Sequence, residues 1–205
     1  MRNKLLLFLL SLSAAALAAQ APAEKKVYHT KHINPHPPQL DGKFEDPVWE
    51  KLDWAGDFTQ REPDDGKAPS QQTNFKITYD DKNLYLAIRA HDSEPDKIVR
   101  RVTRRDQFDG DWLEVNIDSY FDHRTGFSFT INAAGVQGDE AISNDGDNWD
   151  SNWNPVWEAV VALDDGGWNA EIRIPFSQLR FGEKPEHVWG IQVQRRLFRK
   201  QERSV

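Results

Sequence analysis

The sequence has no cysteine and a single methionine, Met1, and these shortages exclude several kinds of site. A chain without cysteine forms no disulfide and offers no thiolate to a metal. Haem ligation through methionine would have to use Met1, so a haem-binding electron-transfer domain is left with histidine or lysine ligation. Glycine-rich phosphate loops are also missing. We therefore expect neither a haem nor a nucleotide cofactor.

Long apolar runs are confined to the N-terminus. Residues 5–16 are almost entirely apolar, but a membrane-spanning helix needs about 20 such residues. Arg2 and Lys4 precede this run and Ala16-Leu17-Ala18 ends it, which is the order of a cleaved export signal. We predict a signal peptide over residues 1–18 and an exported protein that is periplasmic, outer-membrane associated or secreted.

Residues 19–38, which follow the signal, form a predicted linker. This stretch contains four prolines and shows the periodicity of neither a helix nor a strand. The globular domain is therefore predicted over residues 39–205, a length sufficient for one domain with a full hydrophobic core.

Positive charge is scarce relative to negative charge. Lysine and arginine number 26 against 33 aspartates and glutamates, which gives −7, and loss of Arg2 and Lys4 with the signal gives −9. An acidic domain does not attract phosphate backbones, so we expect no nucleic-acid partner. The cluster of four arginines within residues 100–105 is interpreted as a solvated edge held by salt bridges.

Helical periodicity is rare, and strand patterns dominate. Apolar residues alternate over 75–79 and 84–88 on either side of a polar turn, which predicts a hairpin. Further strands are predicted over 112–118, 127–131, 157–163, 168–175 and 188–195, and helical turns over 46–52 and 177–179. Asp46 is the expected cap of the first turn, with Pro47 at its first position. The pattern predicts an all-β, jelly-roll-like sandwich of two antiparallel sheets.

Eight tryptophans are many for this length. Trp49, Trp157, Trp168 and Trp189 fall on strand or helix patterns and are assigned to the core. Two others, at 149 and 153, lie in a polar loop, where they either line a cleft or cover an edge of the sandwich.

Four motifs in order resemble family 9 carbohydrate-binding modules. The segment 40–49, LDGKFEDPVW, is similar to the opening of that family, and 79–86, YDDKNLYL, is similar to its first hairpin. Asp111, Glu114 and Asp118 match a D-x-x-E-x-x-x-D strand, and 167–176 matches GW-x-x-E-x-x-IP. The resemblance implies an antiparallel two-sheet sandwich and polysaccharide or oligosaccharide as ligand.

Other motifs resemble one subgroup of this family, namely those at 105–106, 122–126, 132–137 and 175–181. In that subgroup the module stands at the N-terminus of a larger exported bacterial protein with a predicted outer-membrane β-barrel domain. The resemblance leaves open whether the present chain is a fragment of such a protein. It implies a barrel domain or a glycoside hydrolase as partner, and a role in polysaccharide degradation or uptake.

The resemblance also implies sugar-binding residues. Phe108 and Glu114 occupy the family's stacking and hydroxyl-binding positions, and Thr130 and Asn132 follow on the next strand. Phe108 and Thr130 stand where the family pattern has tryptophan and arginine. Trp112 shares the strand face of Glu114. Each has an alternative: Phe108 anchors a loop, Glu114 is merely solvated, Asn132 stabilises a turn, and Trp112 packs under a loop or a partner.

A calcium site is a further expectation. Asp145, Asp147 and Asp150 lie in a stretch dense in carboxylate and amide oxygens, the ligands that calcium prefers. Asp92 and Asp111, at strand ends, are secondary candidates. The alternative is an acidic loop exposed to water.

We therefore expect a non-catalytic module that binds polysaccharide. A glycoside hydrolase is the first alternative and needs two carboxylates roughly 5 to 10 Å apart, one with a raised pKa. No segment of the sequence provides an apolar pocket that would raise it. The second alternative is a structural docking domain for an outer-membrane barrel, which would bind no sugar.

Overall fold

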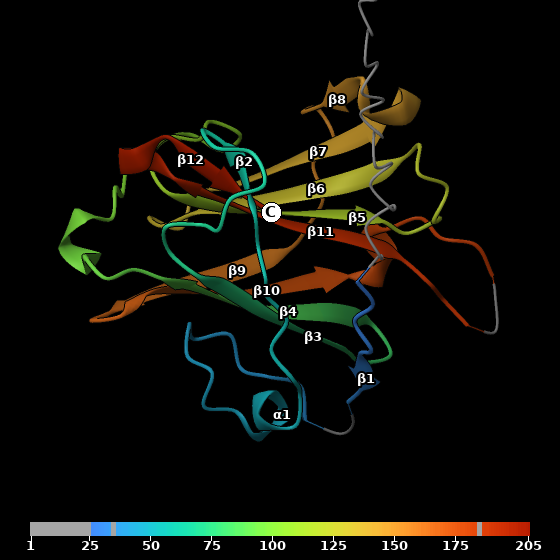
Figure 1. Ribbon diagram of the computed structural model, residues 1–205. Helices are drawn as coiled ribbons and strands as arrows, with labels where there is room; N and C mark the ends of the chain where they lie inside the picture. The colour runs from blue at the N-terminus through green and yellow to red at the C-terminus, as the bar shows by residue number, and fades with distance from the viewer. Residues whose placement is uncertain (1–25, 34–35, 184–185) are drawn as a thin grey trace, which may run out of the picture.

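The computed structural model describes residues 26–33, 36–183 and 186–205, and in it two β-sheets pack face to face (Figure 1). The five-stranded sheet, the lower layer in Figure 1, has the order β1-β3-β4-β10-β9, and the seven-stranded sheet above it has the order β2-β12-β11-β5-β6-β7-β8. The paired strands run antiparallel apart from β1 with β3. The predicted sandwich is confirmed.

The five-stranded sheet consists of β1 Lys31–His32, β3 Thr73–Tyr79, β4 Asn83–His91, β9 Glu158–Asp164 and β10 Gly167–Pro175. The seven-stranded sheet consists of β2 Gln60–Glu62, β5 Trp112–Asp118, β6 Gly126–Asn132, β7 Gln137–Ser143, β8 Asn148–Asp150, β11 Gly190–Leu197 and β12 Glu202–Ser204. The helical elements are α1 Pro47–Glu50 and the single turns η1 Pro95–Lys97, η2 Asn144–Gly146, η3 Phe176–Gln178 and η4 Phe198–Lys200.

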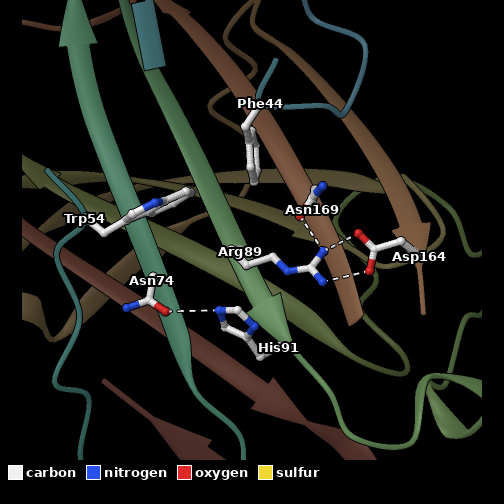
Figure 2. Close-up of a pocket in the computed structure, with 7 residues that line it drawn as sticks. All are labelled: Phe44, Trp54, Asn74, Arg89, His91, Asp164 and Asn169. Carbon is white, nitrogen blue, oxygen red and sulfur yellow. Dashed lines mark hydrogen bonds and ion pairs between the residues drawn. The ribbon is translucent and has the colours of Figure 1, made fainter. Parts of the chain in front are cut away.

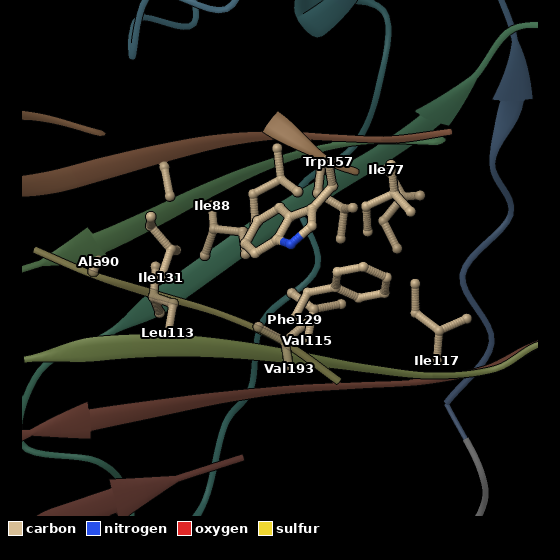
Figure 3. Close-up of a cluster of buried hydrophobic side chains, with 14 of the residues drawn as sticks. Ile77, Ile88, Ala90, Leu113, Val115, Ile117, Phe129, Ile131, Trp157 and Val193 are labelled. Atoms are coloured by element: carbon tan, nitrogen blue, oxygen red, sulfur yellow. The ribbon is translucent and has the colours of Figure 1, made fainter. Parts of the chain in front are cut away.

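Alternation along each strand divides residues between the core and the outer faces. On β5, Leu113, Val115 and Ile117 are fully buried and contact the apolar side of the five-stranded sheet (Figure 3). Their neighbours Trp112 and Glu114 must then point outward, because successive side chains of a strand lie on opposite faces. The outer face of the seven-stranded sheet is thereby left polar and aromatic.

The outer face of the five-stranded sheet is partly covered by α1 and the segments that flank it (Figure 1). Trp49 is buried there, and its indole Nε1 donates to Glu171 Oε1 over 2.9 Å. The other carboxylate oxygen accepts the backbone N–H groups of Asp41 and Gly42, each over 2.9 Å. Gly42 has φ +79°, and a Cβ there would lie 2.6 Å from Ala162 Cβ, so the turn requires glycine.

Helix α1 begins at Pro47 and Asp46 occupies its N-cap position, both as predicted, but the side-chain cap bond is absent. The Asp46 side chain makes no cap hydrogen bond, and its Oδ2 instead accepts the backbone N–H of Gln39 over 3.1 Å. The turn is stabilised by burial of Val48 and Trp49 rather than by its N-terminal side chain.

The ordered fold begins before the predicted start at Gln39. Lys31 and His32 form β1, and Thr30 Oγ1 donates to Ile77 O over 2.7 Å. The predicted linker therefore contains a short strand, which the sequence did not reveal because backbone pairing with β3 needs no apolar periodicity. Trp189 is only half-buried against the core, unlike the other three tryptophans assigned to it.

The predicted signal peptide, residues 1–18, lies outside the described residues. Within the part that the structure describes, no helix has the length and apolar character needed to cross a membrane.

Candidate functional site

All five sequence-predicted sugar residues lie on the outer side of the seven-stranded sheet, although Asn132 and Thr130 are buried there. Glu114 on β5 pairs with Thr130 on β6, and Thr130 pairs in turn with Gly138 on β7. Directly opposed residues share a face, so these positions form a row across three strands. Trp112 lies two residues before Glu114 on the same face, and Phe108 reaches it from the preceding loop. We call this surface the β5–β7 face.

The Phe108 ring lies directly over Gly138. A Cβ added to Gly138 would be 2.0 Å from Phe108 Cζ, so the missing side chain makes room for the ring. Because Gly138 shares the face of Glu114, the half-buried Phe108 lies on the outside of the sheet and not in the core. The tip of the Phe108 ring therefore contacts a strand position in the same cross-strand row as Glu114.

The Glu114 carboxylate is held in place by amide side chains. Its Oε1 accepts from Asn116 Nδ2 over 2.8 Å and from Gln194 Nε2 over 3.3 Å. Burial raises the pKa of Glu114 above its ordinary value, although the hydrogen bond from Asn116 and the charge of Arg203 oppose the rise. The sequence did not predict this raised pKa, because Glu114 lies on the outward, polar side of its strand and its burial is not visible in the strand pattern.

A second carboxylate, Glu140, lies on the same face. It is two residues beyond Gly138 on β7 and is half-buried. Burial raises the pKa of Glu140, and the charges of Glu114 and Asp106 raise it further. Sequence reasoning missed this residue, since the segment QGDEAIS shows no clear strand pattern.

Trp112 is half-buried, and its ring carries a cation on one side. The Arg203 guanidinium carbon lies 5.8 Å from the ring centroid. Arg203 Nη1 is also 3.6 Å from Glu62 Oε1, so an ion pair holds the arginine over the indole. Trp112 therefore borders the face from a fixed position.

Asn132 belongs to the fold and not to the exposed surface. Its side chain is completely buried, and Nδ2 donates to the carbonyls of Arg101 (2.8 Å) and Asp109 (3.4 Å). Its Oδ1 accepts the N–H groups of Ala134 (3.0 Å) and Val136 (2.9 Å). Since the amide has no further hydrogen-bonding capacity, Asn132 cannot bind a sugar hydroxyl. It fixes the loop that carries Phe108.

The same loop is held by two of its arginines. Arg101 Nη1 contacts both carboxylate oxygens of Asp109, at 2.9 and 2.7 Å, and Arg105 pairs with the buried Asp139. The prediction of a salt-bridged arginine edge is confirmed for these two residues. Thr130, the remaining predicted contact, is 3% exposed beneath the face.

The β5–β7 face continues into a hollow of about 510 Å³ at the other end of the same strands. Asn116, the partner of Glu114, lines it together with Gln192 on β11. The side-chain amides of Asn116, Gln192 and Gln194, which we call the amide row, thus connect Glu114 on the face to the hollow.

The predicted calcium ligands do not form one site. Asp92 is paired with Arg199 over 2.6 and 2.7 Å, and Asp111 accepts the N–H groups of Val99 (3.2 Å) and Phe198 (2.6 Å). Asp145, at the opposite end of the sheet, is paired with Arg124 over 2.8 Å.

The remaining two loop candidates, Asp147 and Asp150, also lack a common site. Asp150 accepts from the backbone and side-chain nitrogens of Asn152, and Asp147 is exposed. Within the described ranges, no group of three or more acidic or histidine side chains could hold a metal ion. The five carboxylates therefore lie in separate contacts, and calcium binding stays a prediction.

A second hollow, of about 520 Å³, lies on the outer face of the five-stranded sheet (Figure 2). It is lined by Phe44, Trp54, Asn74, Arg89, His91, Asp164 and Asn169. Sequence reasoning missed it. The alternation of the β3–β4 hairpin does place Asn74 and Arg89 outward, but the aromatic residues come from the segments around α1.

The model of the family described as "Carbohydrate family 9 binding domain-like" matches residues 40–200. A family 9 carbohydrate binding module from Caldicellulosiruptor kristjanssonii, solved with glucose, is 18% identical. The match covers 82% of this chain and 78% of that module, with a TM-score of 0.58. A structure of such a module from the same organism with cellotriose is 16% identical, and the match covers 86% of this chain and 82% of that module, with a TM-score of 0.60. These similarities support the fold. No curated protein matched.

Proposed function

The chain belongs to the carbohydrate family 9 binding domain-like family, and from that premise we propose that it is a non-catalytic module that binds polysaccharide or oligosaccharide on its β5–β7 face. One observation carries the proposal: the Phe108 ring lies over Gly138 on the same face as the half-buried Glu114. A pyranose presents an apolar C–H face, which stacks on an aromatic ring, and hydroxyls, which donate to a carboxylate.

The surroundings of this pair support the same ligand. Glu114 is oriented by Asn116 and Gln194, so a sugar hydroxyl would meet an acceptor that is already fixed. The amide row and the adjoining hollow extend the surface along the strands, which suits a chain of sugars better than a single ring. The open face gives shallow binding, with affinity dominated by stacking and hydroxyl contacts.

We place this module in an exported protein that acts in polysaccharide degradation or uptake. The basic, apolar and small-residue order of residues 1–18 supports export. A glycoside hydrolase or an outer-membrane barrel is the expected partner, and the module would hold polysaccharide close to it.

Calorimetric titration of the purified protein with glucose, cellotriose and xylan oligosaccharides tests the proposal. We expect Phe108→Ala to weaken binding roughly tenfold, the effect of losing about 1.4 kcal/mol of stacking. Val102→Ala is the matched control, because Val102 lies in the same loop and is 85% exposed. Equal affinity of the two variants would show that the site is placed wrongly.

The hydrolase alternative is tested separately, because Glu114 and Glu140 are two carboxylates with raised pKa values on one face. Reducing-sugar release from the same polysaccharides should stay at the level of a protein-free control. Steady release that disappears in Glu114→Gln would contradict a non-catalytic module. Absence of binding to every saccharide would favour a docking domain instead.

A further inference from the structure

The hollow on the five-stranded sheet has the composition of a ligand site. Phe44 and Trp54 form its aromatic wall, and side chains from β3, β4, β9 and β10 form a polar floor (Figure 2). It shares no lining residue with the β5–β7 face and lies on the opposite outer face of the sandwich.

The aromatic wall is fixed in place while remaining accessible. Trp54 is 43% exposed, and its ring meets that of Phe44 edge to face at 5.5 Å. The ammonium of Lys76 lies 4.5 Å from the Trp54 centroid and donates to Trp49 O over 2.5 Å. An exposed indole held by a buried lysine and a second ring is pre-organised for stacking, because little side-chain freedom remains to be lost.

The charges on the floor of the hollow are already paired. Arg89 forms two parallel 2.7 Å bonds to the carboxylate of Asp164, and its Nη1 also donates to Asn169 Oδ1 over 2.8 Å. A Cβ at Gly166 would lie 2.6 Å from Arg89 Nη2, so the glycine admits the guanidinium. The pair leaves no net charge for an ionic ligand.

The rest of the floor offers neutral donors and acceptors. His91 Nε2 is 3.2 Å from Asn74 Oδ1, and the Asn74 amide nitrogen lies against the Gly56 backbone. This part of the floor therefore offers a ligand the second lone pair of Asn74 Oδ1 and the His91 ring. Burial and the charge of Arg89 lower the pKa of His91, which favours the neutral imidazole. Neutral polar groups opposite an aromatic wall fit a ring that carries hydroxyls.

We infer that this hollow is a second saccharide site, with Trp54 as its stacking surface and Asn74 and His91 as hydroxyl partners. The hollow stands on its own geometry, while the choice of a saccharide rests on the proposed function. Since the two sites lie on opposite faces, one short oligosaccharide cannot fill both. Each molecule would instead join two polysaccharide chains, with a gain in avidity on a dense substrate.

Indole N–H signals in ¹H–¹⁵N spectra of the full chain, titrated with cellotriose and xylotriose, test the inference. Trp54 reports on the hollow, Trp112 reports on the β5–β7 face, and Trp168 is the control, because its side chain is fully buried in the core between the sheets. We expect the Trp54 signal to shift in the wild type and in Phe108→Ala, while the Trp168 signal stays unmoved.

A Trp112 shift with a silent Trp54 would overturn the second site and leave the proposed function standing. A Trp54 shift with a silent Trp112 would support the second site and count against the β5–β7 face. If neither the Trp54 signal nor the Trp112 signal shifts with any saccharide, both the second site and the proposed function would be overturned.

A variant gives an independent check. Trp54→Ala should weaken saccharide binding at the hollow roughly tenfold, read from the Asn74 side-chain amide signal. Its thermal midpoint should match that of Trp149→Ala, since both side chains are equally exposed. An Asn74 signal that titrates as in the wild type would overturn the role of Trp54.

Discussion

At the scale of single residues, three buried or half-buried carboxylates hold segments of the fold or the candidate site in position. Glu171 attaches the α1 segment through three hydrogen bonds, Asp92 neutralises Arg199, and Glu114 stands ready as an acceptor on the β5–β7 face. Sequence motifs located Glu114 and Glu171, whereas Asp92 was predicted only as a secondary calcium ligand. Their roles depend on partners far along the chain, such as the 107 residues that separate Asp92 from Arg199, and these could not be predicted.

Saccharide binding should depend on the ionisation of Glu114. Its folded pKa is raised by burial above the ordinary 4.5, and only the ionised form accepts hydroxyl hydrogen bonds with both oxygens. Affinity should therefore fall as pH decreases through that raised value, at a higher pH than an exposed glutamate would give. Titrations between pH 7 and pH 4 check this, and a Glu114→Gln protein with the same pH profile as wild type would contradict it.

Asp92→Asn should destabilise the protein by about 3 kcal/mol, because Arg199 and the buried Arg195 would lose their partner. Burial by itself raises the pKa of Asp92, but the Arg199 hydrogen bonds and other contacts lower it below 3.8 overall. A lowered folded pKa gives stability that is complete above the unfolded value and is lost as pH falls below it.

The measurement is urea unfolding of both proteins from pH 7 down to pH 2. The wild type should lose stability below about pH 3.8, and the difference between its free energy of unfolding and that of Asp92→Asn should become smaller there. A gap that is independent of pH would show that the ion pair does not contribute in this way.

At the scale of elements, alternation predicted the strands that carry the core. Leu113, Val115 and Ile117 on β5 place Glu114 outward by geometry alone. Strand β7 could not be predicted, because its inward-facing Asp139 interrupts the apolar pattern and is stabilised by Trp157 Nε1 at 3.0 Å. Phe108 was expected at the site. Its contact with Gly138 was not expected, because Gly138 lies on β7, a strand that the sequence did not reveal.

Gly138→Ala should weaken saccharide binding roughly tenfold by displacing Phe108, whose ring tip would lie 2.0 Å from the new Cβ. The half-buried ring can swing outward, so stability should change less than binding. Gly182→Ala is the matched control, since nothing lies within 4 Å of a Cβ there. Unchanged binding by Gly138→Ala would mean that the position of Phe108 is irrelevant to the ligand.

At the scale of the whole molecule, the sandwich offers two outer faces with different coverings. The loop that carries Phe108 covers part of the seven-stranded sheet at Gly138, while the five-stranded sheet carries the α1 segment and keeps a hollow beside it (Figures 1 and 2). The core between the sheets holds both faces rigid (Figure 3). A rigid scaffold with exposed aromatic residues suits recognition of an extended polymer.

A crystal structure of the protein with cellotriose or a xylan oligosaccharide would show directly whether the β5–β7 face binds the sugar. We expect a sugar ring stacked on Phe108, with a hydroxyl within hydrogen-bonding distance of Glu114. A bound saccharide that contacts neither residue would contradict it.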